Sequence, residues 1–99
     1  MKITLLYFDD CPNWVEASAH LDALVAENSE ITVERRVVDT PELADELSFR
    51  GSPSVLIDGR DLFADPEMPV GLSCRIYQTP DGPAGSPTLN QLREAIAPR

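Results

Sequence analysis

Lysine, histidine and cysteine are nearly absent from the sequence. It contains one lysine (Lys2), one histidine (His20) and two cysteines, Cys11 and Cys74. Basic residues number 8 and acidic residues 17, so the formal net charge is −9. A chain this acidic offers no electrostatic surface for nucleic-acid phosphates or anionic lipids, and we expect neither nucleic acid nor membrane as a partner. One histidine and two cysteines cannot supply a zinc site with four Cys and His ligands, and we expect no metal and no cofactor.

Long hydrophobic runs are also missing. No stretch approaches the roughly 20 apolar residues that cross a bilayer. The short apolar run over 3–8 is followed directly by two aspartates and has no small-residue cleavage site. We therefore expect that it is not a signal peptide. The expected location is therefore the cytoplasm. The 99 residues, of which 42% are hydrophobic, predict one domain over 1–99 that builds a core without disulfides or a structural metal.

The first part of the sequence predicts a strand, a helix and a second strand. Residues 2–8 are almost continuously apolar or β-favouring, which is typical of a strand buried on both faces. Cys11 and Pro12 then open a helix, because proline suits the first helical position, and apolar residues recur at helical spacing until about Asn28. Residues 31–38 alternate as a strand. The strand–helix–strand spacing predicts a right-handed β-α-β unit with parallel strands.

The middle of the sequence predicts a second helix and two further strands. Thr40 and Pro41 have the residue types of an N-cap and a first helical position. Residues 54–57 read as a third strand, and the Asp-Gly pair at 58–59 favours a tight turn. Residues 60–64 are therefore expected to form a fourth strand, antiparallel to the third.

The last part of the sequence predicts a long loop and a third helix. Residues 65–87 hold five prolines and three glycines, with one apolar island at 74–77. Such long loops are uncommon in small domains and are often functional. A capping box from Thr88 to Gln91 begins the final helix. The expected order is β-α-β-α-β-β-α, with a four-stranded mixed sheet and helices on both faces.

Cys11 occupies a position that favours a reactive thiol. It follows the first strand and precedes a helix, whose unpaired N–H groups and positive dipole end favour the charged thiolate. Asp9 and Asp10 oppose this by like-charge repulsion, but their side chains can turn to solvent. The alternative is that Cys11 is a buried, inert residue.

These features together resemble the thioredoxin-like superfamily. The resemblance covers residues 1–64 and 88–97, and rests on the Cys-Pro-Asn-Trp segment at 11–14 and the Gly-Ser-Pro segment at 51–53. It implies a three-layer α/β sandwich in which the Pro/Gly-rich loop at 65–87 is an insertion.

The resemblance also implies roles for individual residues. Cys11 matches the first, nucleophilic cysteine of the family's Cys-X-X-Cys site, and Trp14 stands where the second cysteine would be. Pro53 matches a cis-proline beside the nucleophile, and Ser52 supplies the backbone that pairs with a substrate strand. With Pro12, these residues would form the substrate-binding surface.

Two functions are compatible with a site of this kind. The favoured one is a thiol–disulfide redox protein in which Cys11 attacks a disulfide-containing protein or a small-thiol substrate. Either a small thiol or Cys74 would then resolve the mixed disulfide. Alternatively, Cys74 packs under the loop as a small hydrophobe. The second function is a non-catalytic module that binds a peptide, a partner protein or a soft metal through Cys11 and Cys74.

The remaining charged residues read as solvated surface. Arg50 and Arg75 could place positive charge near a thiolate, but an exposed position is the commoner one for arginine. Asp58, Asp61 and Asp65 lack the spacing of a calcium loop, so we expect them on a solvated hairpin.

Overall fold

The structure, a computed structural model, describes residues 1–64 and 67–97. Within these ranges strands and helices follow in the order β1 (Lys2–Tyr7), α1 (Trp14–Glu27), β2 (Thr32–Val37), α2 (Pro41–Glu46), β3 (Ser54–Ile57), β4 (Tyr77–Thr79), β5 (Gly82–Ala84) and α3 (Leu89–Ile96). None of these helices has the length and apolar character needed to cross a membrane.

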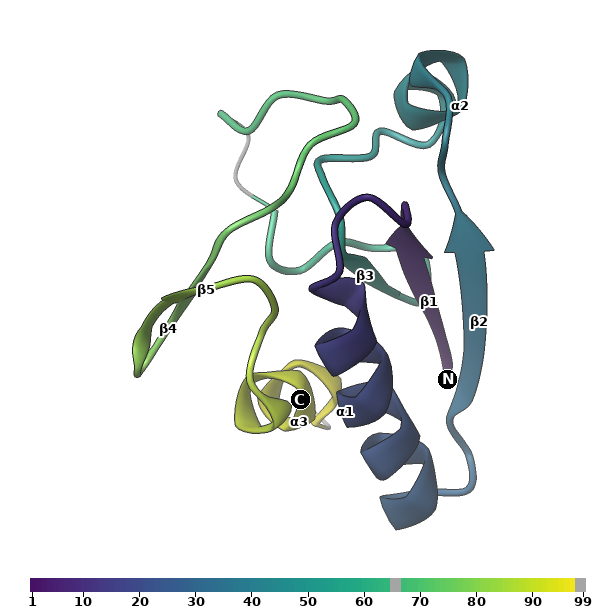
Figure 1. Cartoon of the computed structure of the whole chain (residues 1–99). Helices are drawn as coiled ribbons and strands as arrows, with labels where there is room; N and C mark the ends of the chain where they lie inside the picture. Colours follow the sequence, from purple (N-terminus) through teal and green to yellow (C-terminus); the bar gives the residue numbers. More distant parts are fainter. Residues whose placement is uncertain (65–66, 98–99) are drawn as a thin grey trace.

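β1 lies at the centre of a three-stranded mixed sheet with the order β2-β1-β3 (Figure 1). β2 runs parallel to β1, with Lys2 opposite Thr32, and β3 runs antiparallel, with Ile3 opposite Ile57. The parallel pair with α1 between its strands confirms the predicted β-α-β unit. Hydrophobic clusters cover both faces of β1, which explains its nearly continuous apolar sequence.

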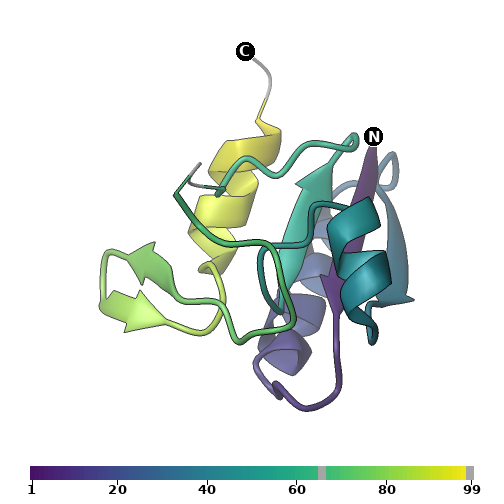
Figure 2. The same ribbon diagram turned by 90° about the horizontal axis from the view of Figure 1, so that it is seen from above.

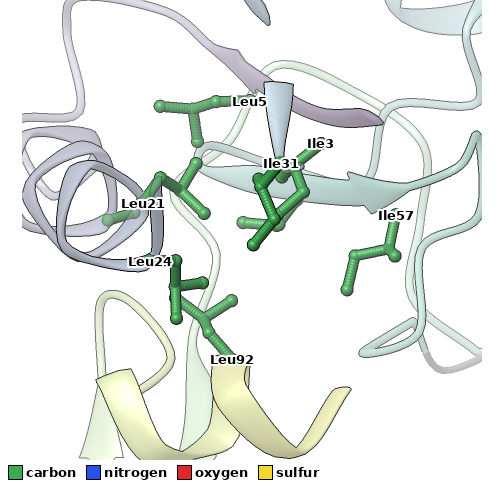
Figure 3. Packing of buried hydrophobic residues seen from close by; sticks show 9 residues of the cluster. Ile3, Leu5, Leu21, Leu24, Ile31, Ile57 and Leu92 are labelled. Carbon is green, nitrogen blue, oxygen red and sulfur yellow. The ribbon is translucent and has the colours of Figure 1, made fainter. Parts of the chain in front are cut away.

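Alternate residues of β1 contribute to hydrophobic clusters on opposite faces of the sheet. Ile3 and Leu5 pack against α1 and α3 in the larger cluster, whose buried members Figure 3 shows at close range. Leu6 points the other way, into a smaller cluster with Phe49 and Ala44 of α2. The prediction of helices on both faces of the sheet is therefore confirmed.

The turn predicted at 58–59 is present, but the fourth strand predicted over 60–64 is wrong. Pairing with β3 stops after one isolated bridge, because Asp61 begins a second turn. The Asp61 carboxylate accepts a hydrogen bond from the Phe63 N–H (3.1 Å), and the Asp61 carbonyl accepts one from the Ala64 N–H (3.3 Å). Side-chain bonding of this kind competes with a strand ladder, so the sheet has three strands instead of four.

The segment predicted as one loop, 65–87, contains a β-hairpin in its described part. β4 and β5 pair antiparallel, and the Thr79 hydroxyl closes the turn by donating to the Gly82 carbonyl (2.6 Å). Figure 2 shows this hairpin standing out from the three-stranded sheet on the side of α3. The strands have only three residues each and include Pro83, so the composition of this segment did not indicate strands.

Two of the predicted helix starts are confirmed. The Thr40 hydroxyl caps α2 by accepting a hydrogen bond from the Leu43 N–H (3.1 Å). Thr88 and Gln91 form the predicted capping box of α3, with reciprocal bonds of 3.1 and 2.9 Å. The start of α1 differs from the prediction, because the helix begins at Trp14.

Candidate functional site

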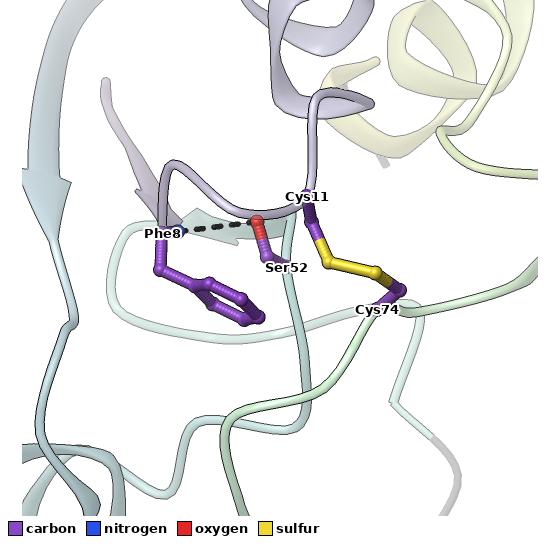
Figure 4. The surroundings of a disulfide bond; sticks show 4 residues. All are labelled: Phe8, Cys11, Ser52 and Cys74. Atoms are coloured by element: carbon purple, nitrogen blue, oxygen red, sulfur yellow. Dashed lines mark hydrogen bonds between the residues drawn. A yellow bond between two sulfur atoms is a disulfide. The ribbon is translucent and has the colours of Figure 1, made fainter.

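Cys11 and Cys74 are joined by a disulfide bond, although 63 positions separate them in the sequence (Figure 4). Cys11 follows β1, and Cys74 lies on the irregular segment between β3 and β4. Their Cα atoms are 5.7 Å apart, within the usual range for bonded cysteines. Cys74 was expected either beside Cys11 or packed under the loop, and the structure places it beside Cys11.

Cys11 lies in a turn that precedes α1. Its N–H donates to the Phe8 carbonyl (3.3 Å), and the Val15 N–H donates to the Pro12 carbonyl (3.1 Å). Each of these hydrogen bonds spans three residues, as in a turn, and the α-helix itself begins at Trp14. The prediction that the helix opens at Cys11 and Pro12 is therefore wrong. Cys11 still stands at the end of α1 that carries the unpaired N–H groups.

The two cysteines differ in exposure. Cys11 is 1% exposed, whereas Cys74 lies at the surface. The Cys74 residue is therefore the end of the disulfide that lies nearer to solvent.

The segment around Cys74 pairs with the backbone of Ser52. The Ser52 N–H donates to the Ser73 carbonyl (2.8 Å), and the Arg75 N–H donates to the Ser52 carbonyl (3.0 Å). Ser52 and Pro53 are buried and are joined by a cis peptide bond. Both backbone groups of Ser52 that were expected to bind a substrate strand are thus occupied by the protein's own chain.

The close approach of this segment depends on Gly51. Gly51 has φ +109°, and an added Cβ would meet the Arg75 Cβ at 3.0 Å and the Ser73 carbonyl oxygen at 3.1 Å. On the opposite side, the Ser52 hydroxyl accepts a hydrogen bond from the Phe8 N–H (3.2 Å), the dashed line in Figure 4. Ser52 thereby links the end of β1 to the segment that carries Cys74.

Arg75 is a residue whose role the sequence did not reveal. It is 3% exposed and not on the solvated surface as expected. Its guanidinium binds the Asp61 carboxylate through both terminal nitrogens (2.6 and 3.2 Å), donates to the Ser54 hydroxyl (3.2 Å) and stacks over the Tyr77 ring. Asp61 is thus part of a largely buried ion pair, and the expectation of a solvated hairpin is wrong for it. Asp65, placed in the same group, lies outside the described residues.

Tyr77 fastens β4 to the same region. Its side chain is buried, and its hydroxyl donates to the Pro53 carbonyl (2.5 Å). Burial raises the pKa of Tyr77 well above its usual range, so the hydroxyl remains a donor. The apolar island at 74–77 was the only sequence signal for this anchor. Within it, the Tyr77 side chain is buried.

The other two residues proposed to contact substrate differ in their surroundings. Pro12 is exposed and adjoins Cys11 in the chain. The Trp14 ring stacks on the Tyr7 ring (centroids 4.3 Å apart) and packs against the larger hydrophobic cluster. The Trp14 side chain thus supports the junction of β1 and α1, which leaves a substrate contact by this residue as a prediction.

No protein-family model matches the chain, and neither a curated protein nor a solved structure matches it. Among the described residues, no group of three or more His, Cys, Asp or Glu side chains could hold a metal ion. The disulfide and its surroundings are therefore the features of the molecule that bear on function.

Proposed function

We propose that the chain is a thiol–disulfide redox protein of the thioredoxin-like class, with Cys11 and Cys74 as its working pair. The observation that carries the proposal is the disulfide between a cysteine that precedes α1 and a cysteine on the segment bound to Ser52. A pair with one buried and one exposed member can exchange with solution thiols and still be held in register by the fold.

The arrangement of the elements supports the thioredoxin-like part of the proposal. The β2-β1-β3 sheet with a parallel β-α-β unit, α1 and α3 on one face and α2 on the other gives three layers. The proposed family fold has a fourth strand in the sheet, whereas here the β4-β5 hairpin forms a separate pair. The family assignment therefore relies on the three-layer arrangement and on the positions of Cys11 and Pro53.

The proposed reaction begins with the reduced pair. One thiolate of the pair attacks a substrate disulfide RSSR′, which forms a mixed disulfide between that cysteine and RS and releases R′S⁻. The other thiolate of the pair then attacks the protein sulfur of this mixed disulfide, which releases RS⁻ and forms the Cys11–Cys74 disulfide. Two electrons pass from the pair to the substrate, and each released thiolate takes a proton from water.

Cys74 replaces the second cysteine that the chain lacks at Trp14. The Arg75–Asp61 ion pair and the Tyr77–Pro53 hydrogen bond do not involve the disulfide, so they continue to hold the segment when the bond is reduced. Cys74 then stays close to Cys11 and reacts as if it were present at high local concentration.

The acidity of the chain narrows the class of partner. A net charge of −9 repels anionic thiols and slows their encounter with the site. Neutral thiols, or protein partners with basic surfaces, should react faster. In a reducing cytoplasm, the location we propose, such a disulfide is transient and belongs to a reaction cycle.

The direct test is turnover of a disulfide-bonded fluorescent peptide with dithiothreitol as the final reductant. Wild type should accelerate reduction of the peptide, and Cys11→Ser and Cys74→Ser should each lose the acceleration, because neither variant can form the Cys11–Cys74 disulfide. The proposal fails if wild type gives no acceleration and its Cys11 alkylates no faster than free cysteine. It fails equally if Cys11→Ser is as active as wild type.

A second candidate function, binding of a soft cation by the reduced pair, is favoured by the 5.7 Å separation of the two Cα atoms. Two thiolates so close can both ligate one Cu(I) or Hg(II) ion. Tight one-to-one binding of Cu(I) by the reduced protein, together with no peptide turnover, would favour this candidate over the redox function.

A further inference from the structure

We infer that an external thiol reduces the oxidised protein by attacking the Cys74 sulfur, with Cys11 as the leaving thiolate. This inference rests on the proposed redox function and assigns the sulfur at which the reductant enters. The resemblance alone implies the opposite assignment, since it places the exchanging sulfur at the cysteine before the first helix.

The geometry of exchange makes access decisive. A thiolate attacks a disulfide sulfur along the extension of the S–S bond, from the side opposite to the leaving sulfur. Attack on Cys11 must therefore come from beyond Cys11, a residue that is 1% exposed. Attack on Cys74 comes from beyond Cys74, which lies at the surface. The fold leaves one of the two approaches open.

The backbone keeps Cys74 in this outward position. Its neighbours Ser73 and Arg75 are both hydrogen-bonded to Ser52 on the inner side. Arg75 is further fixed by its ion pair with Asp61. Cys74 is thereby held between two anchored residues, so reorientation that would bury it and expose Cys11 requires these bonds to break.

The leaving group also favours this direction. A sulfur that departs as a thiolate leaves faster when its charge is stabilised. Cys11 stands before the N-terminus of α1, whose dipole and unpaired N–H groups favour negative charge. Cys74 lies on an irregular segment and has no helix terminus of its own.

Reduction of the Cys11–Cys74 disulfide takes two steps. A thiolate RS⁻ attacks the Cys74 sulfur, forms RS–S–Cys74 and releases the Cys11 thiolate. A second RS⁻ attacks the R-bearing sulfur of this adduct, which releases the Cys74 thiolate and the oxidised reductant RSSR. Two electrons pass from two molecules of RSH to the pair, and the protein and solvent share the two protons.

The experiment identifies which cysteine carries the first adduct. Oxidised wild-type protein is mixed briefly with 2-mercaptoethanol, a neutral thiol, and quenched in acid so that thiols are protonated and exchange stops. Digestion with pepsin under acid separates Cys11 from Cys74, and mass spectrometry locates the adduct. We expect at least about tenfold more adduct on Cys74 than on Cys11 at the earliest times.

The same measurement in concentrated urea is the control. Unfolding exposes both sulfurs, so the preference for Cys74 should fall to near parity. Native adducts that are equal on the two cysteines, or mainly on Cys11, would overturn the inference and leave the redox function intact. An unchanged preference for Cys74 in urea would also overturn it, because the preference would not arise from the fold. No exchange at either sulfur would refute the redox function itself, and the inference with it.

Discussion

Gly51 and Arg75 decide how closely the segment with Cys74 approaches the sheet. Neither residue takes part in sulfur chemistry. Gly51 leaves room for the backbone at 73–75, and Arg75 carries its charge into a buried position where Asp61 neutralises it. The reactive pair is thus positioned by residues that a search for nucleophiles passes over.

Substitution of Gly51 tests the close approach. Gly51→Ala places a methyl group about 3 Å from Arg75 and Ser73 at φ +109°, and should destabilise the oxidised protein by about 1–3 kcal/mol. Gly59→Ala is the matched control, because Gly59 has φ +84° but nothing within 4 Å of the added Cβ. Urea unfolding measures both variants. A loss at Gly51 no larger than at Gly59 would contradict a crowded contact with the 73–75 segment.

Removal of the Asp61 charge tests the ion pair with Arg75. Asp61→Asn leaves the buried guanidinium uncompensated and should lower the free energy of unfolding by about 3 kcal/mol. Asp22→Asn removes the partner of Arg35 at a site where the Asp22 side chain is 72% exposed, and should cost less than about 1 kcal/mol. Equal effects of the two substitutions in urea unfolding would show that Arg75 does not depend on Asp61.

At the scale of elements, periodicity predicted the parts of the chain whose structure depends on local pattern. The strands at 2–8, 31–38 and 54–57 correspond to β1, β2 and β3 within one or two residues, and the capping sequences marked α2 and α3. Each of these segments has a repeating apolar face or a capping side chain. Such signals depend only on neighbouring residues, so they can be recognised in the sequence alone.

The errors arose where a tertiary contact overrides composition. A strand was expected over 60–64, but the Asp61 carboxylate bonds to a nearby N–H and to Arg75, and both bonds draw the chain away from β3. A plain loop was expected over 65–87, but Tyr77 binds Pro53 and fixes β4. The Arg75–Asp61 and Tyr77–Pro53 contacts span 14 and 24 residues, so they leave no local pattern in the sequence. The Asp61 turn itself is local, but the Asp-Gly pair before it favoured a hairpin.

The sequence predicted the parts of the candidate site and, as one of two alternatives, the pairing of Cys11 with Cys74. Cys11 and the Ser52–Pro53 pair were recognisable from their positions before a helix and before a strand. The exposure of Cys74 and the occupation of the Ser52 backbone by 73–75 come only from the three-dimensional structure.

Tyr77, which anchors β4, makes the free energy of unfolding fall at alkaline pH. Because burial raises the pKa of Tyr77, the unfolded chain loses this proton first, near the ordinary tyrosine value of about 10. The contribution of Tyr77 is complete below that pH and declines as pH rises above it. Tyr77→Phe should therefore lower stability at neutral pH by about 1 kcal/mol, through loss of the bond to Pro53. The variant should also show a shallower alkaline decline.

Chemical denaturation of wild type and Tyr77→Phe between about pH 8 and about pH 11 checks this expectation. Two parallel curves of stability against pH would contradict a buried, protonated Tyr77. A variant as stable as wild type at neutral pH would contradict the bond to Pro53.

On the scale of the whole molecule, the disulfide closes a loop with a sequence separation of 63. Loop-closure entropy of the unfolded chain predicts that the oxidised protein is more stable than the reduced protein by about 4 kcal/mol. Urea unfolding with and without reductant measures this difference. Cys74→Ser is the control, since its stability should not respond to reductant. If the free energy of unfolding of the wild-type protein also does not change with reductant, the result would contradict a loop closed by the disulfide.

Reversible pairing of Cys11 with Cys74 is tested by the intact mass of native protein equilibrated across a series of dithiothreitol redox buffers. We expect two interconverting species, the dithiol and an intramolecular disulfide that is lighter by two hydrogens. Their ratio should be the same whether equilibrium is approached from the oxidised or the reduced side. A protein that gives only buffer adducts or disulfide-linked dimers would contradict the proposal that Cys11 and Cys74 form a reversible redox pair.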